Sequence, residues 1–210
     1  MIELNWSGLR NEKGIGNLIS SPTAGGLIAG VRIEPSSLYP DDRGYFMEIA
    51  RMGQKLVAGF DGEKTQVSCA LTYPGAIKAF HFHRFQTDVW APASGMFQVA
   101  LVDLRPDSPT YGSRNTIYAG ALRPWQILIP PGVGHGYKVL GDMPAMLVYV
   151  TNQLYNPEDE GRIAYSTRPL ITIGKRNTNE NSGYGRSRVY RFRLRANHSC
   201  LGSRGTHCQP

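Results

Sequence analysis

Short apolar runs of strand length, broken by turn signals, are the feature that most constrains the fold of this 210-residue chain. The apolar runs lie at residues 27–33, 96–104, 125–129 and 145–150. Segments rich in Pro, Gly and Asp lie between them, at residues 40–44, 73–75, 106–109 and 140–142. Such segments favour tight turns, because Pro and Gly supply backbone angles that strands and helices avoid. Many short strands with few helical stretches predict an all-β sandwich or barrel.

Composition and patterning divide the chain into three zones. Hydrophobic residues make up 41% and charged residues 19%, which is the balance of a folded globular protein. We predict an N-terminal arm at residues 1–27, one domain at residues 28–165 and a basic, poorly ordered tail at residues 166–210. The three cysteines are too widely spaced to predict a disulfide framework or a CxxC zinc pair.

The net charge of +7 is concentrated in the tail. Residues 175–210 contain eight Lys or Arg and one acid, Glu180, whereas the rest of the chain has equal numbers of basic and acidic residues. A one-sided basic tail can bind nucleic acid. Solvated disorder is the commoner state of such a segment, and we expect no nucleic-acid partner. A third interpretation of the tail is a change of reading frame near Tyr165.

The distribution of apolar residues also bears on location. No apolar run approaches the roughly 20 residues needed to cross a bilayer. Residues 1–18 are polar and charged throughout, without the apolar centre of a signal peptide. The sequence therefore predicts a cytoplasmic protein with no membrane partner.

Three histidines form the densest group of chemically active residues. His81 and His83 are two residues apart, so on a strand they face the same side. His135 follows a predicted strand and a Pro-Pro-Gly turn. An HxH pair, a polar residue three positions on (here Gln86) and a PxGxxH segment make the pattern of the cupin superfamily. In its metal-binding members these positions are ligands, so the histidines and Gln86 could bind zinc, iron, copper or nickel. The neutral amide is a poorer ligand than a carboxylate.

Several further blocks follow one another in a set order across residues 28–165. They are the D-R-G-Y-F-M-E block at 42–48, Gln66, the segments at 102–105, 108–112 and 129–137, Tyr149, and the segment at 155–160. In this order they resemble the dTDP-4-dehydrorhamnose 3,5-epimerase family. The resemblance implies a cupin-type double-stranded β-helix, a jelly-roll barrel of two packed antiparallel sheets. Family members are generally homodimers with strands exchanged at the interface, so we expect a homodimer.

The resemblance also implies a reaction, the epimerisation at C3, C5 or both of a nucleotide-linked 4-keto-6-deoxyhexose. The C–H bonds beside the ketone are acidic because the carbanion is delocalised as an enolate. The reaction therefore needs a base on one face of the sugar and an acid on the other, with no metal or redox cofactor. By resemblance His81 is the base and Tyr149 the acid. The other matched positions are implied to bind substrate: Arg43, Phe46, Glu48 and Gln66 the nucleotide, Lys78 and His135 the enolate or the phosphates, and Tyr155 the nucleotide base.

Some positions depart from the family pattern. Lys78 stands where the family has Arg, and Asp88 stands where it has an active-site Lys, which reverses a charge. Residues 165–169 lack the Asp that in the family orients the catalytic His. Two alternatives therefore stay open: a metal-dependent cupin that uses the three histidines, and a non-catalytic cupin that binds a nucleotide sugar. Without the resemblance, Tyr149 would be read as a core side chain and Arg43 as part of a turn.

Overall fold

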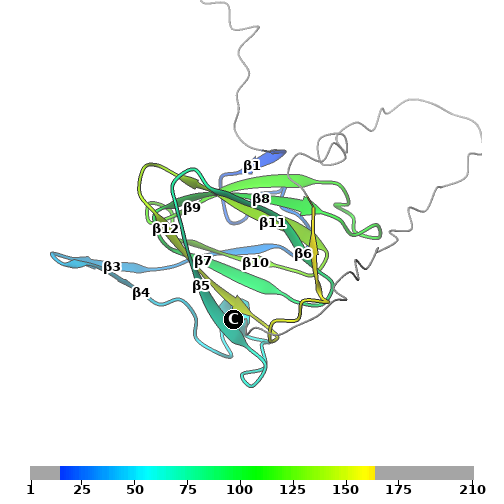
Figure 1. The fold of residues 1–210 in the computed structure, drawn as a ribbon, viewed down its shortest axis with the longest axis horizontal. Helices are drawn as coiled ribbons and strands as arrows, with labels where there is room; N and C mark the ends of the chain where they lie inside the picture. Colours follow the sequence, from blue (N-terminus) through cyan, green and yellow to red (C-terminus); the bar gives the residue numbers. More distant parts are fainter. Residues whose placement is uncertain (1–14, 164–210) are drawn as a thin grey trace, which may run out of the picture. The chain divides into compact units, whose positions relative to one another are not determined.

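Two β-sheets face each other in residues 15–163, the part of the chain that this computed structural model describes (Figure 1). In order across the six-stranded sheet the strands are β1 (Asn17–Ile19), β9 (Arg114–Gly120), β8 (Met96–Asp103), β11 (Val133–Leu140), β6 (Ile77–His83) and β13 (Glu160–Arg162). The five-stranded sheet contains β2 (Arg32–Pro35), β10 (Trp125–Ile129), β7 (Asp88–Ser94), β12 (Ala145–Thr151) and β5 (Gln66–Thr72). β3 (Leu38–Asp41) and β4 (Gly44–Met47) form a hairpin, and η1 (Lys55–Val57) is a 3₁₀ helix.

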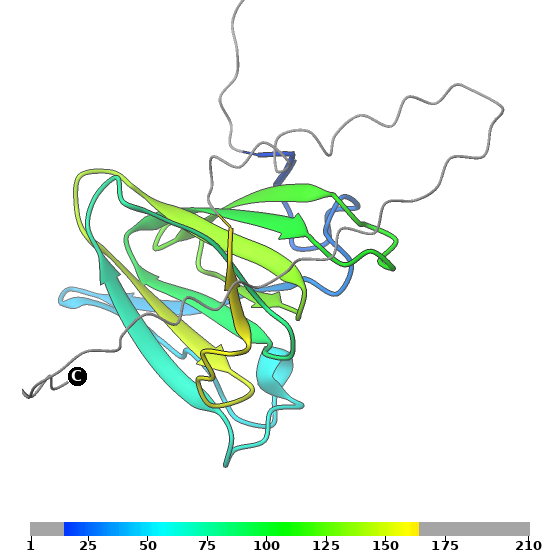
Figure 2. The ribbon, with the colours of Figure 1, turned by 45° about the vertical axis from the view of Figure 1, so that its right-hand side comes forward.

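The predicted all-β architecture of two packed sheets is confirmed, and Figure 2 shows the two layers from a second direction. Neighbouring strands within each sheet run antiparallel, apart from the parallel pair of β1 and β9. β10 coincides with the run predicted at 125–129, and β8 and β12 match the runs at 96–104 and 145–150 to within one residue. These runs form strands because their β-branched and aromatic residues pack well on a pleated surface.

The prediction of a strand over residues 27–33 is wrong for most of that run, since β2 begins only at Arg32. Gly30 has a φ of +82°, a left-handed value that interrupts the extended conformation two residues before β2. The backbone N–H of Ile28 donates instead to the side-chain oxygen of Asn115, at 2.9 Å. Ile28 itself is fully buried. Residues 28–31 of the apolar run therefore form a turn, and this turn places the side chain of Ile28 in the core.

The main core lies between the two sheets. Phe97, Val99 and Leu101 alternate along β8 and are fully buried. They belong to one apolar cluster with Ile127 of β10 and Leu147 of β12 in the opposite sheet. Successive side chains of a strand point to opposite faces, so the inward set of each strand makes this core.

A smaller apolar cluster covers part of the outer face of the five-stranded sheet. Val89, Leu128 and Val150 point outward from β7, β10 and β12. Leu56 and Val57 of η1 pack against them. The segment after the hairpin is thus held to the sheet by apolar contacts.

Part of the predicted arm also packs on the sheets. β1 pairs with β9, and Ile19 is buried. The side chain of Asn115 donates to the carbonyl of Gly26, at 2.8 Å. The predicted tail at 166–210 lies outside the described residues. Within residues 15–163, no helix has the length and apolar character needed to cross a membrane.

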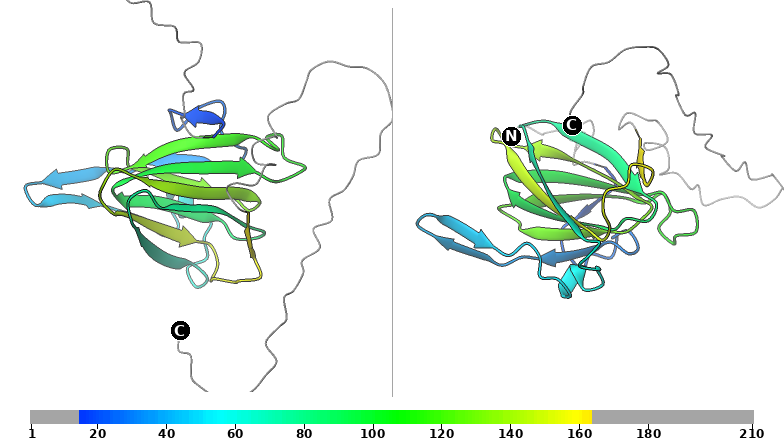
Figure 3. Two further views of the ribbon diagram at one scale, coloured as in Figure 1. Left: turned by 45° about the horizontal axis from the view of Figure 1, so that its top comes forward. Right: turned by 60° about the horizontal axis from the view of Figure 1, so that its bottom comes forward.

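The β3–β4 hairpin extends away from the two sheets (Figure 3). Its aromatic side chains Tyr39 and Phe46 are 60% and 67% exposed, and their ring centroids lie 6.2 Å apart. The hydroxyl of Tyr45 donates to the carbonyl of Ala93 in β7. The hairpin is therefore anchored at this contact while its apolar rings stay open to solvent.

A buried carboxylate organises the loop between β8 and β9. Asp103 accepts hydrogen bonds from the Arg105 guanidinium and from the hydroxyls of Ser108 and Thr110, at 2.6–2.9 Å. Burial would raise the pKa of Asp103, but these hydrogen bonds outweigh it and lower the pKa to about 2. Arg105 also donates to the carbonyl of Ala29, so one carboxylate orders two loops.

We expect Asp103→Asn to lower the free energy of unfolding by about 2 kcal/mol, because charge-assisted hydrogen bonds to a buried carboxylate are lost. Urea unfolding at pH 7 measures this. The lowered pKa stabilises the fold above the unfolded value of 3.8, and this contribution is lost as the pH falls toward about 2. Asp107→Asn, at an exposed position of the same loop, is the control and should change little. Equal effects of the two variants would contradict the assignment.

Candidate active site

A cavity of about 330 Å³ opens between the two sheets. Its walls come from β6, β11 and β13 on one side and from β5, β7 and β12 on the other. Six of the nine residues predicted to form the site line it: Gln66, Lys78, His81, His135, Tyr149 and Tyr155. Residues brought together from six strands therefore share one concave surface, as expected of a binding or active site.

The other three predicted residues lie elsewhere in the chain's own fold. Arg43 sits at the turn of the hairpin, with a side chain that is 84% exposed and pairs with Asp41 at 2.6 Å. Phe46 and Glu48 line a different cavity, of about 430 Å³, at the base of the hairpin. Within one chain the structure does not bring these residues to the first cavity.

A β-bulge sets the direction of Lys78 and His81. In the pairing of β6 with β11, His135 lies opposite His81 while Tyr137 lies opposite Lys78, so β6 has one extra residue. Two residues three apart would face opposite ways on a regular strand, but here both line the cavity. Gly136 allows this close approach, since a Cβ there would lie 2.3 Å from the Cβ of Ala79.

His81 lies beside a carboxylate that the sequence pattern alone does not single out. Its Nδ1 lies 3.4 Å from Oε1 of Glu160, the first residue of β13. Burial lowers the pKa of His81, and the charge of Glu160 opposes this shift. The imidazole is therefore neutral at neutral pH, with its proton favoured on Nδ1 and a lone pair on Nε2. The region of the missing family Asp, residues 165–169, lies outside the described residues.

Tyr149 approaches the cavity from the opposite sheet. It lies on β12, in register between Ser68 of β5 and Trp90 of β7. Burial raises the pKa of Tyr149, so its hydroxyl keeps its proton at neutral pH. A neutral imidazole on one wall and a phenol on the other give the cavity a proton acceptor and a proton donor on different sides.

Gln66 positions Tyr155. The side-chain oxygen of Gln66 accepts a hydrogen bond from the backbone N–H of Tyr155 at 2.9 Å, and its amide donates to Ser68 at 3.0 Å. The side chain of Tyr155 is largely exposed. Gln66 thus holds an aromatic ring where a planar group could pack on it.

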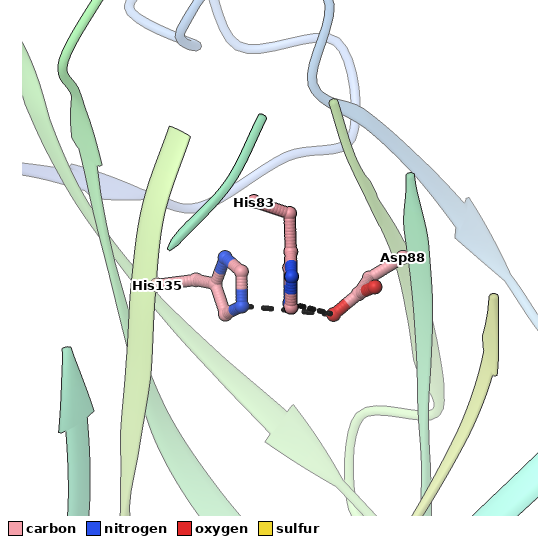
Figure 4. A group of neighbouring side chains, drawn as sticks. All are labelled: His83, Asp88 and His135. Carbon is pink, nitrogen blue, oxygen red and sulfur yellow. Dashed lines mark ion pairs between the residues drawn. The ribbon is translucent and has the colours of Figure 1, made fainter. Parts of the chain in front are cut away.

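Beneath these residues lies a buried group formed by His83, Asp88 and His135 (Figure 4). Oδ2 of Asp88 lies 3.6 Å from Nε2 of His135 and 3.9 Å from Nε2 of His83. The imidazoles are roughly parallel, with centroids 5.4 Å apart. The sequence indicates Asp88 only as a reversed charge, and its pattern groups His83 and His135 with His81 and Gln86 instead. In the structure, the group of potential ligand atoms lying within 4.8 Å of one another contains Asp88 and omits His81.

Asp159 holds the loop that joins β6 to β7. Its carboxylate accepts the backbone N–H groups of Arg84, Phe85 and Gln86 at 2.8–3.0 Å, and also the amide of Gln153 at 2.7 Å. The sequence offered no signal for this role, since Asp159 stands among other acids in the 155–160 block. By fixing the loop, Asp159 fixes the end of β6 and the start of β7, which carry His83 and Asp88.

We expect Glu160→Gln to lower the pKa of His81 further, because the variant removes the negative charge that opposes the effect of burial. The pH dependence of the His81 ring-proton shifts in NMR spectra measures this. Glu158→Gln, at an exposed position two residues earlier, should leave the pKa of His81 unchanged. An unchanged or higher pKa of His81 in Glu160→Gln would contradict the effect assigned to Glu160.

Comparison with known proteins gives a consistent result. The family model described as dTDP-4-dehydrorhamnose 3,5-epimerase matches residues 27–176. The spore coat polysaccharide biosynthesis protein SpsL of Bacillus subtilis is 43% identical over 146 residues, which cover 69% of this chain and 94% of SpsL.

Two solved structures at 25% identity support the same assignment. One is ChmJ, a 3'-monoepimerase from Streptomyces bikiniensis in complex with dTDP-quinovose, with a TM-score of 0.61 over 75% of this chain and 80% of that one. The other is the 3,5-epimerase RmlC of Legionella pneumophila in complex with dTDP-4-keto-L-rhamnose, with a TM-score of 0.59 over 67% and 76%. These neighbours share the barrel of two packed sheets described above. The chain therefore belongs to the dTDP-4-dehydrorhamnose 3,5-epimerase family.

Proposed function

We propose that this chain epimerises C3, C5 or both of a nucleotide-linked 4-keto-6-deoxyhexose. The observation that carries the proposal is the placement of His81 and Tyr149 on opposite sheets around one cavity. Inversion of a carbon needs a proton removed from one face and returned to the other, and these two groups have the matching protonation states. The ligands bound in the two solved relatives, dTDP-quinovose and dTDP-4-keto-L-rhamnose, support a dTDP sugar as the substrate.

In the proposed mechanism, Nε2 of His81 takes the proton from the carbon beside the ketone. The C–H electron pair moves toward the carbonyl, whose oxygen becomes the enolate oxygen. Tyr149 then gives its hydroxyl proton to the same carbon from the other side. Water afterwards restores the proton of the tyrosinate and removes the proton from the imidazolium, so the enzyme returns to its first state. Glu160 stabilises the imidazolium that forms.

The remaining cavity residues bind the substrate in this proposal. Lys78 supplies a positive charge for the enolate oxygen or the phosphates. His135 also lines the cavity. Because it is buried, we expect it to contact the enolate and not the phosphates. Gln66 and Tyr155 receive the nucleotide base. The cytoplasmic location expected from the sequence stays a prediction.

We further propose a homodimer in which the hairpin of one copy completes the cavity of the other. Arg43, Phe46 and Glu48 lie outside their own chain's cavity. Arg43 and Phe46 are exposed on the hairpin, and Glu48 follows it. An apolar surface is also available for contact. On the outer face of β5, Val67 and Leu71 are 64% and 60% exposed, and Cys69 between them is exposed. Exposed apolar patches of this kind often mark interfaces.

Proton exchange tests the reaction directly. In deuterated water, the wild-type chain should exchange the C3 or C5 proton of dTDP-4-keto-6-deoxyglucose, as followed by NMR. We expect His81→Ala to slow this exchange by at least about 100-fold, because the general base is lost. Tyr149→Phe should retain dTDP binding and abstract a proton but return it poorly, which lowers product formation. Tyr111→Phe, at an exposed loop position, is the matched control.

A fully active His81→Ala variant would refute the mechanism. Binding of the nucleotide sugar without any exchange by the wild-type chain would favour the non-catalytic alternative.

Complementation tests the shared site. At a substrate concentration well below KM, His81→Ala and Arg43→Ala should each be nearly inactive alone. When the two variants are unfolded and refolded together, heterodimers form in which one of the two cavities has both an intact His81 and an intact Arg43 from the partner. We expect about a quarter of the wild-type activity to return, since half of the dimers are mixed and half of their sites are intact. Activity no higher than that of the separate variants, in a species of twice the 23.2 kDa chain mass, would contradict a shared site.

A further inference from the structure

We propose that Arg162 binds the diphosphate of the nucleotide sugar from the edge of its own chain's cavity, a role that deepens the proposed function and rests on it. Arg162 is the last residue of β13, which lies at one end of the six-stranded sheet as the structure describes it. It belongs to none of the sequence blocks that indicated the site. The support comes from its register in the sheet, its ion pair and its free hydrogen-bond donors.

The register of β13 turns Arg162 toward the cavity. In the antiparallel pairing of β13 with β6, Arg162 lies directly opposite His81. Two side chains that lie directly opposite each other in such a pair share one face of the sheet. His81 lines the cavity, and so does Glu160, two residues before Arg162 on the same strand. Arg162 therefore projects from the cavity face of this wall, and because its side chain is largely exposed, it lies at the open edge.

The exposure of side chains along β6 shows which end of this wall is open. The side chain of His83 is 8% exposed and that of His81 is 37% exposed. Lys78, further along the same strand, is exposed. The wall thus runs from a closed end at His83 to an open end at Lys78, and Arg162 lies on the open side of His83. Lys78 and Arg162 are therefore two cations near the mouth of the cavity, where they attract an entering anion.

Glu160 holds the Arg162 guanidinium and leaves most of its donors free. Nε of Arg162 donates to Oε1 of Glu160 at 2.7 Å. The same oxygen lies 3.4 Å from Nδ1 of His81, so the cation lies close to the proposed base. A guanidinium has five N–H donors, of which Nε–H is one. Within residues 15–163, Arg162 forms no hydrogen bond or ion pair other than the one with Glu160. Its two terminal nitrogens can therefore donate as a pair to the oxygens of a phosphate.

Arg162 lies between the part of the cavity proposed for the sugar and the part proposed for the nucleotide base. On the sugar side it shares the Glu160 oxygen with His81. On the base side it interacts with Tyr155: the hydrogen bond with Glu160 raises the pKa of Arg162, and the nearby Tyr155 phenol adds to this shift. In a nucleotide sugar the diphosphate joins the sugar to the nucleoside. The cation is thus placed where the diphosphate of a bound substrate passes.

The ion pair also offsets the charge of Glu160. A carboxylate beside the proposed base stabilises the imidazolium that forms, but the same negative charge repels the diphosphate of the substrate. Because Arg162 pairs with Glu160, the carboxylate can keep its contact with His81 while the pair as a whole is neutral. The free side of the guanidinium then presents positive charge to the phosphates.

Binding of two ligands that are not turned over tests the assignment. With the full-length chain, calorimetry gives the Kd of dTDP, and an NMR titration of the protein gives the Kd of thymidine, which has no phosphate. We expect Arg162→Gln to weaken dTDP binding by about 10- to 100-fold, because a charge-assisted contact with phosphate is lost. Its affinity for thymidine should not change. Arg162→Lys keeps the charge but not the paired donors, so its Kd for dTDP should lie between those of Arg162→Gln and wild type.

The kinetic constants give a second measurement where the chain is active. The diphosphate is bound equally in the ground state and in the transition state, so Arg162→Gln should raise KM by a similar factor and leave kcat nearly unchanged. A residue that served only to hold Glu160 against His81 would instead lower kcat, and this outcome would contradict the proposal.

Arg84→Gln is the matched control, since it removes an exposed arginine from the loop that follows the closed end of β6. It should bind dTDP like the wild-type chain. Equal dTDP affinities of Arg162→Gln and wild type, an equal loss for dTDP and thymidine, or no dTDP binding by the wild-type chain would each overturn the proposal. The result is independent of the exchange assay, because neither ligand reacts. Binding that depends on Arg162 without proton exchange removes the epimerase function and leaves this role, and exchange with binding that does not depend on Arg162 does the reverse.

Discussion

The alternation of side chains along β5, β7 and β12 is the constraint on which the rest of the structure depends. Ser68, Trp90 and Tyr149 lie in register across these strands and point into the barrel, while their neighbours in sequence point outward. A slip of one residue in β12 would turn Tyr149 to the outer face and bring Val150 into the cavity. The apolar cluster under η1 opposes such a slip, because Val150 is fully buried there. The outer apolar cluster therefore helps to keep Tyr149 facing the cavity.

The strand period predicted part of the site and could not predict the rest. It placed His81 and His83 on one side of a strand, and both line the cavity. Lys78 lies three residues before His81, so a regular strand would turn it away, and only the family resemblance indicated it. The β-bulge that lets Lys78 and His81 both face the cavity depends on the contact between β6 and Gly136 of β11. Gly136 lies more than 50 residues later in the chain. A local pattern contains no information about a contact of that kind.

The carboxylates were the least predictable part of the site. Glu160 reaches His81 because β13 pairs with β6, a pairing between segments about 80 residues apart. Asp88 reaches His135 because the two sheets pack face to face. The strands themselves were predicted well where a run was both apolar and β-branched, as in β10, and poorly at 27–33, where Gly30 bends the chain. Local propensity thus indicated β8, β10 and β12, whereas the partners of charged groups came from tertiary pairing.

Charge balance bears on the proposed homodimer. Among the residues that line the cavity, Asp88 and Glu160 are acids, and Lys78 is the one Lys or Arg. The proposed substrate brings a diphosphate and passes through an enolate, so further positive charge must come from elsewhere. In the proposed homodimer, Arg43 of a second copy would supply it at the nucleotide. Since the diphosphate is present in the ground state and in the transition state alike, loss of Arg43 should chiefly raise KM.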